Sequence, residues 1–301
     1  MKRFYKIILI AALICIVFGF GMVAVGAVQG GMQSFLNMVD NNEFSISGGN
    51  IVHFGMMEKD EKEYEDRDYS FPVEAIDKLE LDIGASMLEV KYEDGDQYQV
   101  QVRQSKRGYI SCEEDEGTLN IESGIESSTF NLGGEKGNKI ILTIPKDAKL
   151  REIELTLGAG SCTGDRLCAD TIFIEVGAGN LEVDKLKAEK TMELTVGAGN
   201  IEVDKIEAGQ LEVECEVGRC YAKKVTTKAD IDLSCDAGYV YMGLQAAEES
   251  YNYDLSCSIG SLKIAGQQYS GVDFSKDTDH GADKELTAEC NVGAIEIEFD
   301  Q

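Results

Sequence analysis

The segment MELTVGAGNIEV at residues 192–203 contains a Gly-Ala-Gly sequence of the kind that a phosphate-binding loop uses. In such a loop, glycines let backbone N–H groups approach the anion, and a helix follows. Here the residues after Gly199 alternate between apolar and polar types, as in a strand, and no Lys-Ser or Lys-Thr follows. Nearly the same twelve residues, IFIEVGAGNLEV, occur at 172–183. The motif therefore indicates a repeated structural corner, not a phosphate site.

Carboxylates beside lysines are the second set of residues that could take part in catalysis. The candidates are Asp184-Lys185 and Asp204-Lys205 in two Val-Asp-Lys sequences, with Glu182 and Glu202 before them and Tyr221 and Tyr241 continuing the glutamate position. Two carboxylates act as acid and base only where their surroundings separate their pKa values. Outward residues of a repeat are solvated alike, so we interpret this set as a soluble polar face. Nucleophile elbows and P-loops are absent from the sequence, and we expect no catalytic residue and no enzymatic activity.

Three aspartates in SKDTDHGAD at 275–283 could bind calcium through oxygen ligands: Asp277, Asp279 and Asp283. Their spacing lacks the terminal glutamate of a calcium loop and differs from the glycine-rich nonapeptide of calcium-binding solenoids. Ordinary surface acids are the favoured interpretation. We therefore expect no cofactor and no metal site, with calcium as the alternative.

A period of about twenty residues organises the chain from residue 151 onward. With the second glycine of Gly-Ala-Gly as position zero, the corner glycines are Gly160, Gly179, Gly199, Gly218, Gly238, Gly260 and Gly293. Apolar residues fill positions −7, −5 and −3 before each corner and +2 and +4 after it, which is strand periodicity on both sides. We expect the residue at −1 to point inward against the bend. Glycine at zero would tolerate positive φ and let neighbouring backbones approach closely.

No single unit of this repeat can bury its apolar side, but identical units stacked in register can. The pattern predicts an all-β protein, a parallel β-solenoid with coils of about twenty residues. A β-sandwich is less consistent with the pattern because it requires no fixed period. Residues 76–150 are β-like but off the period, so we expect irregular N-terminal coils there and regular repeats at 151–301.

The cysteines occupy regular positions of the same twenty-residue repeat. Four of the nine occupy position −3, where Val176 and Val196 stand in earlier units: Cys215, Cys235, Cys257 and Cys290. Cys162 and Cys220 occupy the inward +2 position. There is no Cys-X-X-Cys pair, and the two histidines, His53 and His280, are far apart in the sequence. We interpret the cysteines as small buried hydrophobic residues, with disulfides between stacked coils as the alternative.

The N-terminus holds an uncharged stretch, IILIAALICIVFGFGMVAVGAV at 7–28, that is long enough to span a membrane as a helix. Basic residues precede it and acidic residues follow. The positive-inside rule therefore places residues 1–6 in the cytoplasm and the C-terminal body outside the cell membrane. A cleavable signal peptide is the alternative. Residues 29–75 are too polar to fold alone and are expected to connect the membrane helix to the solenoid at 76–301.

The segment KIILTIPKDAKLREIELTLGAG at 139–160, followed by glycine-centred coils to Gly260, resembles a family of bacterial envelope proteins named as adhesins and otherwise described as domains of unknown function. The resemblance covers roughly residues 76–301. It implies a β-solenoid exported on a single membrane anchor, and it supplies no catalytic residues.

Two functions are consistent with these observations. The first is a non-enzymatic binding or scaffolding protein of the cell envelope that presents flat strand faces to a wall polymer or an envelope protein. The second is an accessory of an envelope-stress response that captures cationic antimicrobial molecules. The net charge of −27 argues against nucleic acid and anionic lipid as partners, because both would be repelled.

Overall fold

The computed structural model describes residues 46–47, 51–52, 65–105, 108–125, 137–270 and 273–300. The chain divides into two units, Met1–Glu61 with Ser127–Glu135, and Lys62–Glu126 with Lys136–Gln301. In the first unit the described elements are β1 (Ile46–Ser47) and β2 (Ile51–Val52), which pair antiparallel.

The predicted cytoplasmic tail at 1–6, the membrane helix at 7–28 and most of the connector at 29–75 lie outside the described residues. In the part of the chain that the structure describes, no helix is long and apolar enough to cross a membrane. The membrane anchor therefore stays a prediction.

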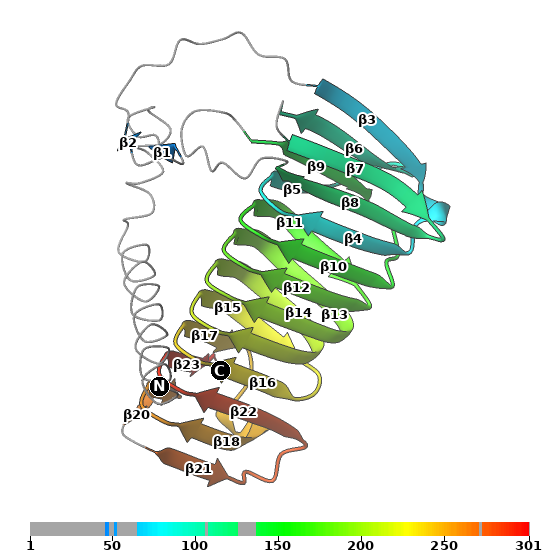
Figure 1. Ribbon diagram of the computed structural model, residues 1–301. Helices are drawn as coiled ribbons and strands as arrows, with labels where there is room; N and C mark the ends of the chain where they lie inside the picture. The colour runs from blue at the N-terminus through cyan, green and yellow to red at the C-terminus, as the bar shows by residue number, and fades with distance from the viewer. Residues whose placement is uncertain are drawn as a thin grey trace, which may run out of the picture. The chain divides into compact units, whose positions relative to one another are not determined.

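The second unit consists of strands that wind into stacked coils (Figure 1). The regular coils comprise β10 (Glu152–Leu157), β11 (Ser161–Ala169), β12 (Thr171–Val176), β13 (Asn180–Val196), β14 (Asn200–Cys215), β15 (Arg219–Thr227), β16 (Ile231–Cys235) and β17 (Tyr239–Leu244). The N-terminal end comprises β3 (Glu65–Pro72), β4 (Lys78–Ile83), β5 (Met87–Glu93), β6 (Gln97–Gln104), β7 (Gly108–Asp115), β8 (Thr118–Ile125) and β9 (Lys139–Pro145). The C-terminal end comprises β18 (Tyr251–Cys257), β19 (Ser261–Ile264), β20 (Gln267–Ser270), β21 (Phe274–Thr278), β22 (Lys284–Cys290) and β23 (Ala294–Phe299). Two three-residue 3-10 turns, η2 (Val73–Ala75) and η3 (Glu248–Ser250), complete the described elements.

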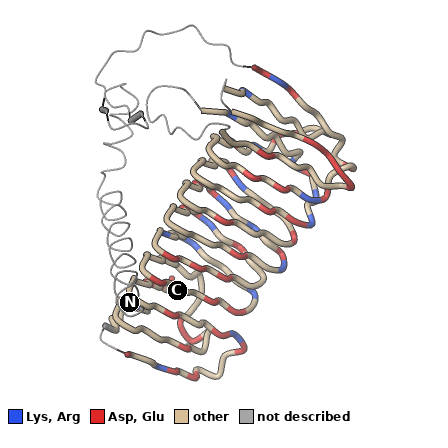
Figure 2. Tube along the Cα trace, in the orientation of Figure 1, with Lys and Arg blue, Asp and Glu red and all other residues tan. Residues whose placement is uncertain are grey.

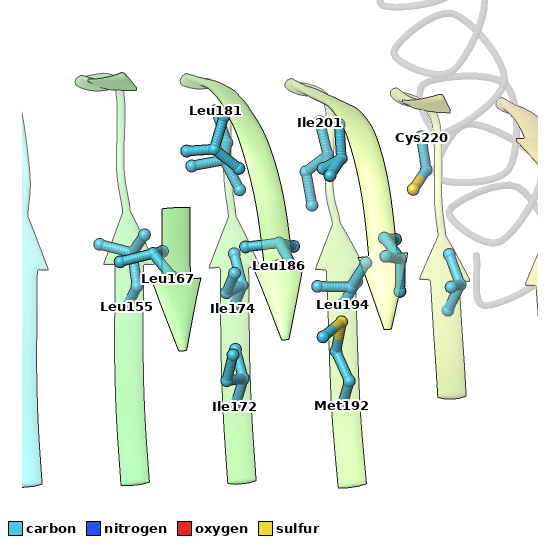
Figure 3. Packing of buried hydrophobic residues seen from close by; sticks show 14 of the residues in the cluster. Leu155, Leu167, Ile172, Ile174, Leu181, Leu186, Met192, Leu194, Ile201 and Cys220 are labelled. Carbon is cyan, nitrogen blue, oxygen red and sulfur yellow. The ribbon is translucent and has the colours of Figure 1, made fainter. Parts of the chain in front are cut away.

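Each coil stacks on the next in parallel register, so that equivalent positions form columns. Leu181 pairs with Ile201, and Ile201 pairs with Cys220, in three successive coils. Figure 3 shows these three side chains in one row across neighbouring strands. All three are fully buried. The predicted parallel stacking of twenty-residue coils is confirmed, and the core is the apolar interior of the stack.

Every coil has two long sides that meet at the glycine corner. The A side holds the strands before the corner, in the spatial order β8, β4, β10, β12, residues 191–196 of β13, residues 211–215 of β14, β16, β22 and β18. The B side holds the strands after it, in the order β9, β5, β11, residues 180–188 of β13, residues 200–208 of β14, β15, β17, β23 and β19.

The spatial order departs from the sequence order at both ends of the stack. The first coil in sequence, β4 and β5, is stacked between the later coil formed by β8 and β9 and the coil formed by β10 and β11. The last coil, β22 and β23, is inserted between the β16–β17 coil and the β18–β19 coil. Antiparallel strands then cover both ends, with β7 on β8, β3 and β6 beside β9, β21 on β18 and β20 on β19. These strands close edges that would otherwise offer unpaired backbone groups to another chain.

The corner differs from the sequence prediction in two respects. Residues at −1 point outward: Ala178 is exposed, and Val292 and Ile259 are 62% and 66% exposed. None of the seven corner glycines has a positive φ. The other predicted reason for glycine, the close approach of neighbouring backbones, is confirmed. A Cβ at Gly199 would lie well under 3.0 Å from the carbonyl oxygen of Gly179 in the neighbouring coil, because the corners stack with their backbones in contact.

Candidate functional site

From β12 onward, the A side carries seven outward carboxylates that lie four or six residues before a corner glycine. We call this set the acidic face: Glu175, Glu193, Glu212, Glu214, Asp232, Asp254 and Glu289. Their outward direction follows from the strand pleat, since the residues between them, such as Leu194 and Val213, are buried. The acidic face is therefore the solvent side of a sheet whose other side is the core.

Three of these carboxylates form a column across successive coils. Glu193 pairs in register with Glu212, and Glu212 pairs with Asp232. Adjacent strands are about 4.8 Å apart, so like charges lie close together with little between them. Partial burial of Glu193, together with the nearby charge of Glu212, raises the pKa of the Glu193 carboxyl. The column is a place where negative charge is concentrated and not neutralised.

No side-chain cation of the described residues pairs with the acidic face. Within the described residues, none of the seven side chains forms an ion pair or a side-chain hydrogen bond. At the N-terminal end of the A side the situation differs, because Lys78 lies 2.8 Å from Glu152 and 2.7 Å from Glu154. From β12 to the C-terminal end of the stack, the carboxylates of the acidic face form no ion pair within the described residues, and Asp82 on β4 is also exposed without one.

An aromatic side chain interrupts the acidic face. Phe173 on β12 pairs in register with Glu154 on one side and Glu193 on the other. It points away from the core and is partly exposed. An outward phenyl ring beside carboxylates can contact the apolar part of a ligand whose charged part the carboxylates attract.

The B side has a mixed charge pattern. Lys185 and Lys205 lie 2.8 and 2.6 Å from Glu207, and their hydrogen bonds lower the pKa of Glu207 to about 2. Lys223 lies 2.5 Å from Asp204. Lysines of the regular coils gather on this side and in the following turn, whereas the opposite strands carry almost none (Figure 2). The two sides therefore differ in their capacity to attract a cation.

The carboxylates considered as catalytic candidates from the sequence, including Glu182 and Glu202, lie on the B side. Glu182 pairs in register with Glu202, and the column continues to Tyr221 and Tyr241, as the repeat predicts. The two tyrosine rings stack with centroids 4.6 Å apart. Glu182 is exposed, and Glu202 lies 3.7 Å from the Lys223 ammonium. This arrangement is an ordered, solvated ladder without an enclosed acid–base pair.

The three aspartates of the C-terminal loop are all exposed. Asp277 on β21 pairs with Asp254, and Asp279 accepts a hydrogen bond from the Gly281 N–H at 2.8 Å. Among the described residues, no group of three or more His, Cys, Asp or Glu side chains could hold a metal ion. The expectation of no metal site, with calcium as the alternative, stays a prediction.

Four cysteines at position −3 stack in the core in the order Cys215, Cys235, Cys290, Cys257. All eight described cysteines are free thiols, and these four are buried. Burial raises the pKa of Cys162 and Cys220 to about 12. Hydrogen bonding to Cys215 raises the pKa of Cys235 to about 11. These groups are protonated and shielded, which suits the role of small hydrophobic residues.

The repeat pattern did not predict one cluster of contacts, which forms around Lys284 and Tyr251. Lys284 at the start of β22 lies with its ammonium 3.3 Å from the Thr227 carbonyl and 3.2 Å from the Tyr251 hydroxyl. The same ammonium lies 4.3 Å from the centre of the Tyr251 ring. His280 Nδ1 lies 2.7 Å from the Tyr251 carbonyl. These contacts hold the inserted coil against both neighbours, and they join residues far apart in sequence.

The corner glycines and the parallel coils place the chain among known proteins. A family model described as Toastrack DUF4097 matches residues 76–298. The chain belongs to this family. The match spans the stacked coils of the Toastrack chain, including the acidic face and the inserted C-terminal coil. No curated protein matches the chain.

Several solved structures are similar to this Toastrack chain. One is a candidate cell adhesion protein from Clostridium sporogenes, with 17% identity, a TM-score of 0.39, and coverage of 79% of this chain and 100% of that one. Another is a candidate adhesin from Bacteroides fragilis, with 15% identity, a TM-score of 0.40, and coverage of 77% and 97%. A third is a candidate lipid-binding protein from Parabacteroides distasonis, with 16% identity, a TM-score of 0.35, and coverage of 77% and 96%.

Proposed function

We propose that this Toastrack chain is a non-enzymatic, adhesin-like binding protein of the bacterial cell envelope whose acidic face binds a positively charged partner. The observation that carries the proposal is the set of seven outward carboxylates on one side of the stack, none of which pairs with a cation in the described part of the chain. On the B side, by contrast, several surface acids pair with lysines, as Glu207 does with Lys185 and Asp204 does with Lys223. A partner that brings its own cations would supply the neutralisation that the A side lacks.

The geometry suits an extended partner. Stacked coils repeat at about 4.8 Å, so the carboxylates form a regular array along a flat sheet instead of lining a pocket. Each unit charge at the surface contributes modestly, but several contacts in one array add up and guide the approach of an oppositely charged partner. Binding of this kind weakens as salt screens the charges.

The proposal includes the location inferred from the sequence. Residues 7–28 would anchor the chain in the cell membrane, with residues 1–6 in the cytoplasm and the coils outside. The partner would then be a positively charged wall polymer or envelope protein. The charge of −27 supports this choice, since anionic lipid and nucleic acid would be repelled.

A second candidate function is the capture of cationic antimicrobial molecules within an envelope-stress response. Phe173 is the observation that favours it, because this partly exposed ring lies between Glu154 and Glu193 in register. Cationic antimicrobial peptides combine positive charge with apolar side chains. An anionic sheet with an outward aromatic ring offers a contact for each part.

The proposed function is tested with the full-length chain in a zwitterionic nanodisc and a fluorescent decalysine peptide. We expect binding whose affinity falls steeply between low and physiological salt, because several ion contacts form together. A decaglutamate peptide of the same length is the control and should not bind. Absence of decalysine binding at low salt would contradict the proposal. For the second candidate, Phe173→Ser should weaken binding of a peptide that also contains apolar residues and leave decalysine binding unchanged.

A further inference from the structure

The outward residues at position −1 form a continuous row along the edge where the A and B sides meet. In spatial order the row reads Ala85, Ala159, Ala178, Ala198, Val217, Ala237, Val292 and Ile259. Backbone hydrogen bonds fix this order: the Val292 N–H donates to the Asp236 carbonyl at 2.6 Å, and the Ile259 N–H donates to the Asn291 carbonyl at 2.8 Å. Every member is apolar, although the position faces solvent.

The side chains of the row become larger toward the C-terminal end. Alanines occupy its first half, whereas Val292 is 62% and Ile259 66% exposed. They lie on adjacent coils, about 4.8 Å apart along the stack. They are two of the four large hydrophobic side chains exposed in the described residues, the others being Met87 and Ile125. Two neighbouring exposed aliphatic side chains in a very acidic protein form an apolar contact surface that the fold itself does not use.

Three carboxylates lie near this end of the row. Glu216 and Asp236 are exposed at the corner, one residue before Val217 and Ala237, and Glu289 is three residues before Val292. In the part of the chain that the structure describes, none of these three carboxylates forms an ion pair, and Asp236 accepts a hydrogen bond from the Asn291 amide at 2.6 Å. We call Val217, Ala237, Val292 and Ile259, with these carboxylates, the corner patch.

The charges around the corner patch select among the partners that could cover its apolar row. A second copy of the chain would bring the same carboxylates against one another, in a protein with a net charge of −27. An anionic membrane surface would be repelled in the same way. A peptide with lysines or arginines on one side and aliphatic residues on the other matches both the apolar row and its acidic border.

We propose that the corner patch docks a cationic amphipathic peptide segment, whose aliphatic side chains cover Val292 and Ile259 while its basic side chains contact Glu216, Asp236 and Glu289. This inference rests on the proposed function, because it assigns the apolar part of the partner to the edge of the acidic face. Val292 and Ile259 supply the discrimination between an amphipathic partner and one that is only cationic. The carboxylates supply attraction to both kinds.

The test uses the full-length chain in a zwitterionic nanodisc and two labelled twelve-residue peptides of equal charge, one alternating Lys and Leu and one alternating Lys and Ser. Empty nanodiscs provide the reference. The variant is Ile259→Ser with Val292→Ser, and both side chains are exposed, so the core is left intact. The matched control is Met87→Ser, which changes a 55% exposed apolar side chain at the opposite end of the stack.

We expect the double variant to lose at least about tenfold in affinity for the Lys/Leu peptide, because two aliphatic contacts are removed. Its affinity for the Lys/Ser peptide, and the affinities of Met87→Ser, should match those of the parent chain. Equal binding of the Lys/Leu peptide by parent and double variant would overturn the corner patch while leaving the proposed function standing if Lys/Ser still binds. Failure of both peptides to bind the parent would overturn both. If the parent chain forms a dimer and the double variant does not, the patch binds a second copy of the chain, and the proposal is overturned.

Discussion

The Asn291 side-chain amide donates a hydrogen bond to the Asp236 carboxylate at 2.6 Å, across 55 residues of sequence. The contact joins the corners of two coils that are neighbours in space but not in the chain, because β18 to β21 lie between them in sequence. The last coil in sequence, β22 and β23, therefore lies within the stack. The outermost coil, β18 and β19, comes earlier in the chain. The C-terminal end is held by pairing on both sides of β22.

Leu286→Ala tests the insertion of β22. Leu286 is fully buried and lies between Ile231 of β16 and Tyr253 of β18. The change should lower the free energy of unfolding by about 2 to 5 kcal/mol. It should also increase amide hydrogen exchange in both β16 and β18. The control is Leu81→Ala in β4, equally buried at the other end, which should increase exchange in β8 and β10 instead. Faster exchange in β18 without any change in β16 would contradict the insertion.

Gly199→Ala tests the reason for the corner glycines. The added Cβ would lie 2.7 Å from Val176 Cγ1 and also against the Gly179 carbonyl, so a coil contact must open. The free energy of unfolding should fall by about 1 to 3 kcal/mol or more, measured by urea denaturation. Gly95→Ala is the matched control, because no atom lies within 4 Å of its added Cβ. Equal stability of the two variants would show that the corners do not stack as tightly as described.

Much of this fold follows from residue types at fixed spacing. Ile172, Ile174 and Val176 alternate with polar residues, and the structure buries all three in a strand. The outward direction of Ala178 and Ile259 could not be read from composition, because small and apolar residues at a bend suit either side. Stacking geometry decides it: the glycine at zero takes the crowded inner position, and its predecessor is forced outward.

The spatial order of the end coils could not be predicted from the sequence either. Each coil carries the same column pattern, and the pattern does not say which neighbour a strand will choose. Leu286 and Cys290 of β22 fit the columns beside β16 as well as Tyr253 and Cys257 of β18 would. The acidic face, in contrast, had a usable signal. Sorting the lysines by repeat position would have shown that they avoid the column that contains Glu193 and Glu212.

Glu207→Gln tests the charge network of the B side. Its carboxyl pKa is lowered to about 2 by Lys185 and Lys205, below the value in the unfolded chain. The ionised group therefore stabilises the fold above the unfolded pKa, and this contribution is lost as the pH falls toward 2. At pH 7 the variant should be less stable by about 1 kcal/mol or less, since the pair is partly exposed. Urea denaturation at pH 7 and near pH 2.5 measures the difference, which should shrink in acid.

Glu182→Gln is the control for the Glu207 variant, because this outward glutamate forms no ion pair in the described residues. It should not reproduce the loss at pH 7. A stability difference between Glu207→Gln and the parent chain that is the same at both pH values would contradict the assignment of the effect to ionised Glu207.

Cys235→Val and Cys235→Ser together test the role of the cysteine column. Val176 and Val196 occupy the same position in earlier coils, so valine should cost less than about 1.5 kcal/mol of unfolding free energy. Serine places a hydroxyl among buried side chains and should cost about 1 to 3 kcal/mol. Urea denaturation under reducing conditions measures both. A more harmful valine than serine would contradict the interpretation of these thiols as apolar core residues.

Binding of decalysine to two charge-matched triple variants tests the central claim most directly. Glu193→Gln, Glu212→Gln and Asp232→Asn neutralise the column of the acidic face, while Asp165→Asn, Glu182→Gln and Asp184→Asn remove the same charge from exposed B-side positions. Both sets lie outside the core, and both change the net charge equally. We expect the first variant to lose at least about tenfold in affinity and the second less than twofold. Equal losses in the two variants would show that net charge, and not the acidic face, governs binding.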